Sequence, residues 1–411
     1  MTGAAGEFLG TIENLEEYLA VSAVESRSSE DVVAEFARRA RKGGISIGRM
    51  MVGWRLLDPL FLSRIVTWER DIGTLVNQFR HGQPSSPDYV GSPINAILTS
   101  GEDELRCRID GTNEPFRFAV LAELQASGLT DYIIFRLRFG SHVSDDGPGA
   151  GVVMSFVSER PGGFTDPELT ALRRLRYMIA LNARTAMEAQ MRRTLASTYL
   201  GRSAGDRVLG GEVARGGGEA IEAVIWYCDL RGSTALCEAM GMDAYLPFLN
   251  DYFSAIAEPV VAEGGEILDF MGDAVLAIFP LGAEGTMERV RRATDVALAR
   301  LDDFRTSHDV LHSREKVADV AGIAIDTGTV VYGNIGIPTR LTFSVIGPTV
   351  NKVTRIEAMT KTLREPVLVS RSVAKGMPEL WRSCGSFHLA GVAGETELFA
   401  LVTEARKSVA A

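Results

Sequence analysis

Hydrophobic residues recur at different spacings along this chain, and the spacing predicts where helices and strands lie. Residues 11–42 carry apolar positions at helical spacing and end in a basic cluster directly before Gly43 and Gly44, which predicts a helical segment that stops there. Short apolar runs bounded by Gly, Ser and Asp follow between residues 45 and 160 and predict the strands of an α+β region. These runs include residues 118–124, 132–139 and 152–157.

A long helix is predicted next. Thr165 can cap a helix that begins near Asp166 and runs to about Leu200, while Pro167 suits its first turn and Glu168 its positive end. Its apolar positions keep a spacing of three and four, at Leu169, Leu172, Leu175, Ile179, Ala183 and Ala186. Such a stripe is either a seam between two copies of the chain, which we favour, or part of the core of its own domain.

The clearest boundary lies at residues 201–219, which contain seven glycines. A flexible linker is the simplest interpretation of this segment. From residue 220 a new pattern begins, with a strand, a long helix, a hairpin, another helix and further strands. The pattern predicts a second α+β domain.

Length, composition and charge limit the functions that fit. A chain of 411 residues exceeds what one hydrophobic core usually organises, so two domains and a connector are expected. With 46% hydrophobic and 23% charged residues the composition is that of a globular protein. A net charge of −10 and a pI near 5.2 argue against a nucleic-acid surface, which needs clustered Lys and Arg, and favour a small partner.

The cysteines and the apolar runs indicate a cytoplasmic protein. The four cysteines are too far apart for a zinc-ligand pattern or a dense disulfide framework, which suits a reducing compartment. They are Cys107, Cys228, Cys237 and Cys384. No apolar run approaches the roughly 20 residues that span a bilayer, and the N-terminus lacks the pattern of a signal peptide. We therefore expect no membrane contact.

Asp229 is the first residue with candidate chemistry. It ends the apolar strand 223–229, and a long amphipathic helix is expected from about Thr234 to Glu263. A carboxylate beside a helix start can hold a metal ion whose other ligands are phosphate oxygens, because the free N–H groups there attract phosphate. Here those groups would come from Gly232 and Ser233 as well as Thr234. A capping or turn role is the simpler interpretation of Asp229 taken alone.

A second carboxylate follows in a predicted β-hairpin. Two apolar runs in residues 265–279 are hinged at Gly272 and Asp273, which places a carboxylate at the tip. The two acids are separated by 44 positions (273 minus 229). Two carboxylates brought together repel unless cations lie between them, and hard oxygen ligands favour Mg²⁺ or Mn²⁺.

The third element is the segment 343–355, where Pro348 suits the first turn of a helix. The four-residue spacing puts Asn351 and Arg355 on one helical face, while Val350 and Val353 can face the core. The amide and the guanidinium can bind a ribose and a phosphate, or they can make ordinary surface hydrogen bonds.

In this order, the three elements resemble the catalytic domain of class III adenylate and guanylate cyclases over about residues 220–403. The resemblance implies a ferredoxin-like α+β fold, and two Mg²⁺ or Mn²⁺ ions per active site held by Asp229 and Asp273, with the backbone carbonyl of Leu230 as a further ligand. It makes Asn351 the ribose-binding residue and Arg355 the residue that stabilises the transition state.

The implied reaction is attack of the ribose 3′-oxygen on the α-phosphorus of a nucleoside triphosphate, with pyrophosphate leaving. The resemblance also implies a homodimer with two sites, in which each protomer supplies the acids of one site and the Asn and Arg of the other. The main interpretation is an adenylate cyclase acting on ATP in intracellular signalling.

Two departures from the family concern base selection and triphosphate affinity. Adenylate-forming members usually carry Lys where this chain has Asp269, and the partner position is Ser344, which suits either base. A Lys often found near the C-terminal strand is also missing, since residues 388–391 occupy that place. A guanylate cyclase acting on GTP, and a weakly active homologue that works as a signalling or binding partner, are therefore the alternatives.

The N-terminal half carries a second resemblance. Residues 151–169 resemble the last strand and final helix entry of a GAF-type sensor domain, which would take an unknown small ligand or protein. The Gly-rich segment is similar to the transducing element that precedes the catalytic domain in many bacterial cyclases. The expected organisation is a helical segment (1–42), a GAF-like domain (43–165), a signalling helix (166–200), a Gly-rich transducing linker (201–219) and a cyclase catalytic domain (220–405).

Overall fold

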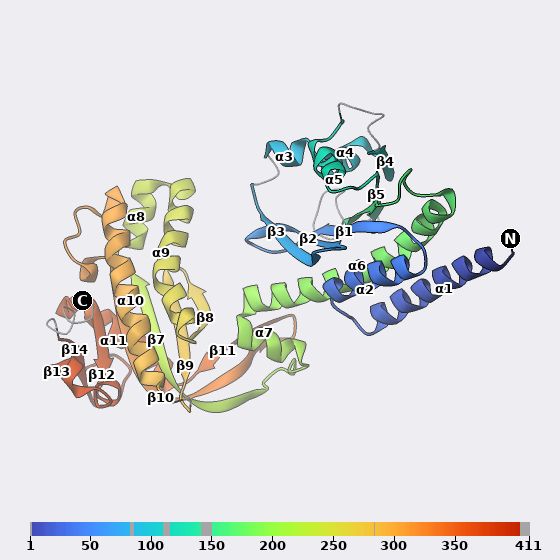
Figure 1. Cartoon of the computed structure of the whole chain (residues 1–411). Helices are drawn as coiled ribbons and strands as arrows, with labels where there is room; N and C mark the ends of the chain where they lie inside the picture. Colours follow the sequence, from blue (N-terminus) through green and yellow to red (C-terminus); the bar gives the residue numbers. More distant parts are fainter. Residues whose placement is uncertain (1, 83–85, 110–115, 141–149, 283, 403–411) are drawn as a thin grey trace. The chain divides into compact units, whose positions relative to one another are not determined.

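The computed structural model describes residues 2–82, 86–109, 116–140, 150–282 and 284–402 (Figure 1). The chain forms two compact units, Met1–Leu195 and Ala196–Ala411. None of the described helices combines the length and the apolar character that crossing a bilayer requires.

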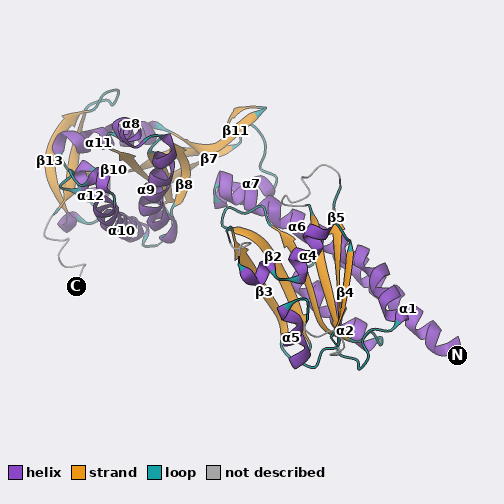
Figure 2. Ribbon diagram, turned by 90° about the horizontal axis from the view of Figure 1, so that it is seen from above, coloured by secondary structure: helices purple, strands orange, loops and turns teal. Residues whose placement is uncertain are grey.

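The first unit is built on one antiparallel sheet with the strand order β3-β2-β1-β6-β5-β4 (Figure 2). The strands are β1 (Ile47–Arg55), β2 (Phe61–Glu69), β3 (Gly73–Arg80), β4 (Glu104–Arg108), β5 (Asp131–Arg138) and β6 (Gly151–Ser158). Alternate side chains of each strand point to opposite faces, so both faces of this sheet are covered by helices.

Helices α1 (Thr2–Val24), α2 (Ser29–Lys42) and α6 (Asp166–Leu200) cover one face and share a core with it. Helices α3 (Pro87–Val90), α4 (Pro93–Ser100) and α5 (Ala119–Ala126) lie on the other face, where α4 and α5 pack in a smaller core (Figure 1). Helix α2 ends at Lys42 with Gly43 as its C-cap, as the sequence predicts.

Two expectations for this unit were wrong. Residues 118–124, expected as a strand, lie mostly in helix α5, because Leu121 and Leu124 are buried at helical spacing and the segment consists mainly of good helix formers. The apolar stripe of α6 is core rather than a dimer seam, since its residues from Leu169 to Ala183 are buried against the helix's own sheet. At the start of α6, the Thr165 hydroxyl donates to Glu168.

The second unit contains a longer mixed sheet. Its strands are β7 (Gly218–Leu230), β8 (Glu266–Met271), β9 (Ala274–Pro280), β10 (Ala321–Ile337), β11 (Arg340–Ile346), β12 (Val367–Ser370), β13 (Trp381–His388) and β14 (Glu395–Leu401). Its helices are α7 (Arg202–Leu209), α8 (Ser233–Met240), α9 (Met242–Ala262), α10 (Thr286–Ser307), α11 (Pro348–Leu363) and α12 (Arg371–Ala374). The single helix expected up to Glu263 is broken at Gly241, which has a positive φ of 77°.

The order of these elements gives a ferredoxin-like fold, as expected. The chain runs β7, α9, β8, β9, α10, β10, and the corresponding strands lie in the order β10-β7-β9-β8. Helices α9 and α10 cover one face, with Phe248, Tyr252 and Leu301 in the core. Helix α11 packs on the other face through Val353 and Ile356.

Part of the Gly-rich segment is helical and packs on the second unit. Ala204 of α7 is fully buried, and the Arg207 guanidinium lies 5.3 Å from the centre of the Tyr332 ring on β10. The Asn334 side chain donates to the carbonyl of Glu212 at 2.8 Å. These contacts attach the segment between α6 and β7 to strand β10.

Candidate active site

The two predicted acids meet at the edge of adjacent strands. Asp229 lies next to the last residue of β7, and its neighbour across the ladder to β9 is Ala274. The β8–β9 turn consists of Gly272 and Asp273, and Gly272 has the positive φ of 68° that this tight turn requires. The turn therefore places the carboxyl of Asp273 next to that of Asp229.

The closeness of the two carboxyls affects the pKa of Asp229. Partial burial, and then the nearby charge of Asp273, raise the pKa of Asp229 to about 6. No basic side chain among the described residues forms a hydrogen bond or ion pair with either carboxyl. A divalent cation would relieve this repulsion, and carboxylate oxygens are the donors that Mg²⁺ and Mn²⁺ take. The pair therefore fits such an ion.

Further metal ligands would have to come from backbone, substrate or water. Within the described ranges, no group of three or more His, Cys, Asp and Glu side chains is arranged to hold a metal. The side chain of Leu230 is buried in the core, so only its backbone carbonyl is a candidate ligand. Helix α8 starts beside the pair at Ser233, with Gly232 as its left-handed N-cap and Thr234 exposed.

A third acid, Glu357 of α11, lies near the pair. Burial, and then the charge of Asp229, raise the pKa of Glu357 to about 7. Gly322 is the β10 neighbour of Asp229, and a Cβ there would lie 2.5 Å from the Glu357 carboxyl and 2.2 Å from the Thr360 hydroxyl. The Arg231 guanidinium donates to that hydroxyl at 2.8 Å. A bare glycine backbone thus lets α11 approach the acid end of β7.

Sequence reasoning missed Glu357 as a neighbour of the acids. Its signal was an acid four positions after the core residue Val353, on the side of the helix that faces the sheet.

Asn351 and Arg355 project together from α11, as predicted. Both are exposed and four residues apart, and neither side chain makes a hydrogen bond or ion pair within the described part of the chain. In particular, nothing in the described residues joins Arg355 to Asp229 or Asp273. One chain thus presents the acids and the amide-guanidinium pair as two separate groups.

A buried ion pair fixes the start of α11. Lys352, next to Asn351, lies 3.0 Å from a carboxylate oxygen of Asp326 on β10, which is 1% exposed. Asp326 also accepts hydrogen bonds from the Ser370 hydroxyl at 2.5 Å and the Thr327 backbone N–H at 2.9 Å. The pair holds the turn of α11 that carries Asn351 against the sheet. It too was missed from the sequence, because its residues are 26 positions apart.

The predicted base-selecting residues lie on two strands. Asp269 is exposed on β8, and its side chain makes no hydrogen bond or ion pair within the described residues. Ser344 is half-buried on β11, opposite Gly333 of β10. Residues 388–391 lie at the end of β13, where His388 is exposed and Leu389 is buried.

Comparisons with known proteins concern the C-terminal unit. The family model described as "Adenylate and Guanylate cyclase catalytic domain" matches residues 219–400. An adenylate cyclase from Anabaena cylindrica is 32% identical over 154 residues, which cover 37% of this chain and 30% of that protein. The alpha subunit of a photoactivated adenylate cyclase from Euglena gracilis is 27% identical over 167 residues, covering 40% of this chain and 16% of the relative.

Among solved structures, the guanylyl cyclase Cya2 is 26% identical, with a TM-score of 0.40, and the match covers 45% of this chain and 93% of that one. The C-terminal unit therefore carries a class III adenylate and guanylate cyclase catalytic domain over residues 219–400. The chain spans less than a third of the length of the curated relatives named here. The resemblance of the first unit to a GAF domain stays a prediction.

Proposed function

We propose that this protein is an adenylate cyclase that converts ATP to 3′,5′-cyclic AMP and pyrophosphate for intracellular signalling, with two Mg²⁺ or Mn²⁺ ions per site at a homodimer interface. The observation that carries the proposal is the uncompensated carboxyl pair Asp229 and Asp273, at the end of a strand and beside a helix start. The name of the Anabaena relative supports ATP as the substrate.

The residues of this chain have distinct roles in that reaction. Asp229, Asp273 and the Leu230 carbonyl would hold the ions. When bound, the ions lower the pKa of the ribose 3′-hydroxyl and neutralise the triphosphate. The backbone N–H groups at Gly232, Ser233 and Thr234 would bind phosphate oxygens.

Arg355 and Asn351 act on the reacting part of the substrate. The Arg355 guanidinium stabilises the charge that grows on the α-phosphoryl oxygens as pyrophosphate leaves, and Asn351 orients the ribose by hydrogen bonding. Both side chains are exposed and without a hydrogen bond or ion pair in the described part of the chain, which supports a role toward a ligand or a second protomer.

The direct test removes each acid in turn. Asp229→Ala and Asp273→Ala are each expected to lower turnover of ATP by at least about 10²-fold, because each removes a charge that stabilises the reacting complex. Asp309→Ala is the matched control, since the Asp309 side chain is fully exposed. An acid variant that is folded by circular dichroism and keeps more than a tenth of wild-type turnover would contradict the two-metal assignment.

A mixing experiment tests the shared site. Asp273→Ala and Arg355→Ala are expected to be inactive alone, and to recover part of the activity when co-expressed, because a heterodimer then has one intact site. Heterodimers isolated with two different tags and still inactive would show that each site is built within one chain.

Guanylate cyclase is the second candidate, and Asp269 favours it. An ionised carboxylate only accepts hydrogen bonds, so it can bind the N1–H and N2–H donors of guanine, whereas in adenine only N6–H is a donor. A site with an unpaired polar group discriminates strongly between bases. The test compares kcat/KM for ATP and GTP in the wild type and in Asp269→Lys.

Two outcomes of this comparison are decisive. A wild-type preference for GTP of tenfold or more that the Lys variant reverses would replace the adenylate proposal by the guanylate one. A preference for ATP in both proteins would show that Asp269 does not select the base.

A further inference from the structure

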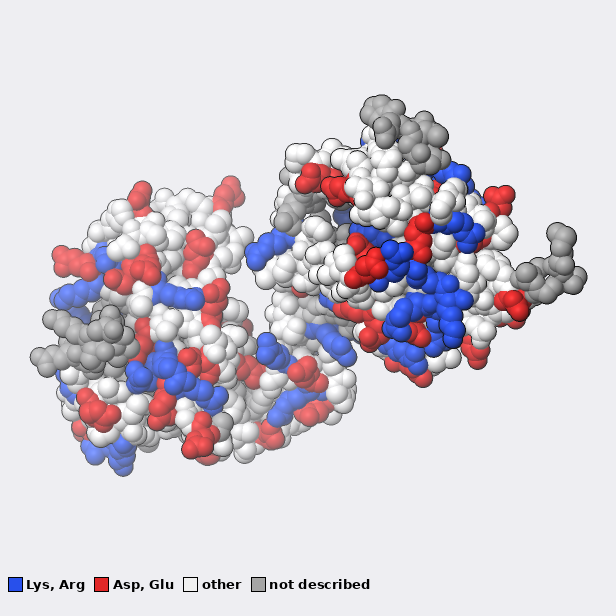
Figure 3. All heavy atoms as spheres, viewed as in Figure 1, with Lys and Arg blue, Asp and Glu red and all other residues white. Residues whose placement is uncertain are grey.

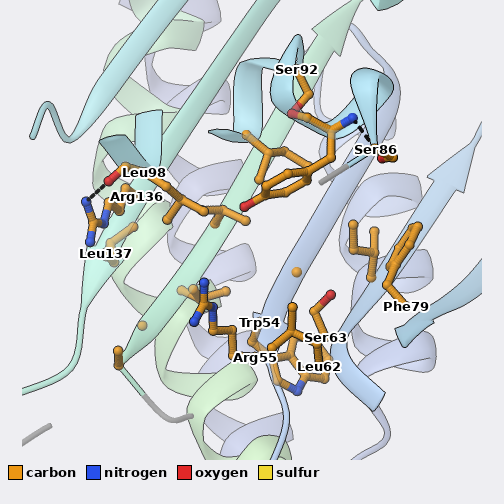
Figure 4. Close-up of a pocket in the computed structure, with 18 of the residues that line it drawn as sticks. Trp54, Arg55, Leu62, Ser63, Phe79, Ser86, Ser92, Leu98, Arg136 and Leu137 are labelled. Atoms are coloured by element: carbon orange, nitrogen blue, oxygen red, sulfur yellow. Dashed lines mark hydrogen bonds between the residues drawn. The ribbon is translucent and has the colours of Figure 1, made fainter. Parts of the chain in front are cut away.

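Arginines in this protein have several kinds of partner. Charges of both signs are mixed on the face of the second unit that Figure 3 shows, and the exposed Arg292 of this unit pairs with an acid at 2.7 Å. Arg136 lines a cavity of about 420 Å³ between the sheet of the first unit and helices α3 and α4, and donates to the main-chain carbonyl of Leu98 at 2.8 Å (Figure 4). Neither contact involves the candidate active site. The half-buried Arg231 belongs to that site, because it follows Asp229 by two positions.

The Arg231 side chain bridges from the end of β7 to helix α11. Its guanidinium donates to the Thr360 hydroxyl at 2.8 Å, and that hydroxyl donates to the carbonyl of Glu357, one turn earlier, at 2.5 Å. Thr360 is fully buried, so the bond from the guanidinium is shielded from water. The Arg231 backbone N–H donates to the carbonyl of Val320 at 2.8 Å. The bridge is therefore anchored at both ends.

Gly322 of β10 leaves the room that this bridge needs. A Cβ at position 322 would lie 2.2 Å from the Thr360 hydroxyl and 3.2 Å from the Arg231 guanidinium, so a larger residue would push the two apart. The Nε of Arg231 is buried and has no hydrogen-bond partner within the described residues. An unpaired buried donor lowers stability, so the stability of the fold alone does not explain why an arginine lies here.

The bridge connects the two groups that the proposed reaction uses. At one end, Arg231 directly follows Leu230, whose carbonyl is the candidate metal ligand, and directly precedes Gly232, the first of the N–H groups proposed to bind phosphate. At the other end, α11 carries Asn351 and Arg355. A helix moves as a rigid element, so a bond near its C-terminal end helps to fix these two side chains as well.

We propose that Arg231 is a positioning residue of the cyclase site, which holds the metal- and phosphate-binding segment after β7 and helix α11 in one fixed arrangement. The inference rests on the proposed function. In the proposed homodimer, the acids of one chain and its Asn351–Arg355 pair serve different sites, so the bond between Arg231 and Thr360 links the two sites.

The first test removes either end of the bridge. Arg231→Met and Thr360→Val are each expected to lower kcat/KM for the preferred triphosphate by about 10- to 100-fold, because small displacements of catalytic groups have effects of that size. The double variant should be no less active than the less active single variant, since both changes remove the same bond. Arg231→Lys should restore part of the activity, because an ammonium group can still donate to the hydroxyl.

Arg305→Met is the matched control. Arg305 is a half-buried arginine of the same unit that pairs with Asp302 and donates to the main-chain carbonyl of Arg314 at 3.1 Å, so these contacts lie within α10 and the segment that follows it. It should keep the wild-type kcat/KM per folded molecule even where its Tm falls. The positioning role is overturned if Arg231→Met loses no more kcat/KM than this control. If Arg231→Met does not fold, the same comparison is made with Thr360→Val.

A heterodimer tests the link between the two sites. When Asp273→Ala and Arg355→Ala chains are combined, the intact site takes its acids from the Arg355→Ala chain and its arginine from the Asp273→Ala chain. Arg231→Met should lower the activity when it is placed in either chain, because the bridge holds both groups. An effect from the Arg355→Ala chain alone would mean that Arg231 fixes only the metal-binding segment, and would overturn the link.

A binding measurement separates this inference from the proposed function. The analogues 3′-deoxy-ATP and 3′-deoxy-GTP lack the attacking hydroxyl, so they can bind with Mn²⁺ but cannot be cyclised. Calorimetric titration should show binding about tenfold weaker in Arg231→Met and Thr360→Val than in Arg305→Met, the loss expected for one hydrogen bond to a charged group. A wild type that binds an analogue without turning over ATP or GTP would contradict the proposed function alone. Equal affinities in the three variants would overturn the positioning role alone.

Discussion

Each unit contains a buried or half-buried aspartate close to other charged groups. In the first unit these groups are basic, and in the second unit the nearest one is acidic. Asp131 in the first unit is fully buried, lies 2.7 Å from the Arg106 guanidinium and 3.3 Å from that of Arg108, and accepts the backbone N–H of Phe164 at 3.0 Å. Asp229 in the second unit has another acid as its neighbour, and its pKa is raised to about 6.

The contrast separates a structural charge from a functional one. A buried carboxylate that is paired with a cation and hydrogen-bonded contributes to the stability of the fold. Two neighbouring acids without a basic partner lower that stability until a cation binds between them. Asp326 is of the first kind, since Lys352 neutralises it. By this criterion Asp229 and Asp273 differ from the buried aspartates Asp131 and Asp326 through their partners.

The largest expected effect is on the paired aspartate. Asp131→Ala should lower the free energy of unfolding of the first unit by about 3 to 5 kcal/mol, because it removes the buried acceptor of the Arg106 guanidinium and of the Phe164 backbone N–H. Urea unfolding of the full chain, followed by circular dichroism, measures the change. Asp71→Ala, which breaks an exposed pair with Arg70, should leave the midpoint unchanged. Equal unfolding midpoints for both variants would contradict the expectation that the buried Asp131 pairs stabilise the fold more than the exposed Asp71–Arg70 pair.

A smaller loss is expected at the base of α11. Lys352→Met should lower the stability of the second unit by about 1 to 3 kcal/mol, since Asp326 keeps its hydrogen bonds to Ser370 and Thr327 but loses its cation. It should also lower kcat/KM, because the ion pair positions Asn351, and Lys352→Arg should restore part of both. A loss of stability with unchanged kcat/KM would contradict the positioning role.

Replacing Asp229 should change the stability of the second unit in the opposite direction. At pH 7.5 without divalent metal, Asp229→Asn should raise the stability of the second unit by about 0.5 to 2 kcal/mol, the usual gain from relieving a strained functional site. Thermal unfolding measures the gain, and added Mg²⁺ should stabilise the wild type more than the variant. A destabilised variant would mean that Asp229 is held by the fold in the way Asp131 is.

The smallest effect is the dependence on pH. The pKa values of Asp229 and Glu357 are raised in the folded chain, to about 6 and about 7. Between about pH 4 and 7 the unfolded chain therefore binds fewer protons, and stability falls as the pH rises through this window. The Tm of wild type relative to Asp229→Asn/Glu357→Gln should decline from pH 4.5 to 7.5 without metal. A constant difference would contradict the raised pKa values.

The sequence predicted the catalytic unit well because its signals are local. The strand before Asp229, the turn at Gly272 and Asp273, and the helix start at Pro348 each lie within a few residues of the chemistry they position. The first unit was predicted less well, because residues 118–124 form a short apolar run, and such a run is compatible with either a helix or a strand. The sequence also left open whether the apolar stripe of α6 packs on a second copy of the chain or on its own domain. Periodicity shows that one face of a helix is buried, but not what covers that face.

Contacts between residues far apart in the chain could not be predicted from the sequence. The pairing of Lys352 with Asp326 and the approach of Glu357 to Asp229 depend on how α11 lies on the sheet, which no local pattern encodes. The bare backbone of Gly322 that permits this approach has no sequence signal of its own. The cavity of the first unit likewise arises from strands and helices far apart in the chain.

The long pairing of β7 with β10 also bears on how the catalytic unit folds. Its register runs from Leu230 opposite Ala321 to Gly218 opposite Gly333, so each pair closes a loop of roughly a hundred residues. Closing such a loop costs chain entropy before any contact compensates, and domains rich in distant contacts fold slowly. During synthesis, strand β7 therefore cannot pair with its central neighbour until β10 has left the ribosome. Until then its apolar residues depend on the β8–β9 hairpin and helices α9 and α10 for cover.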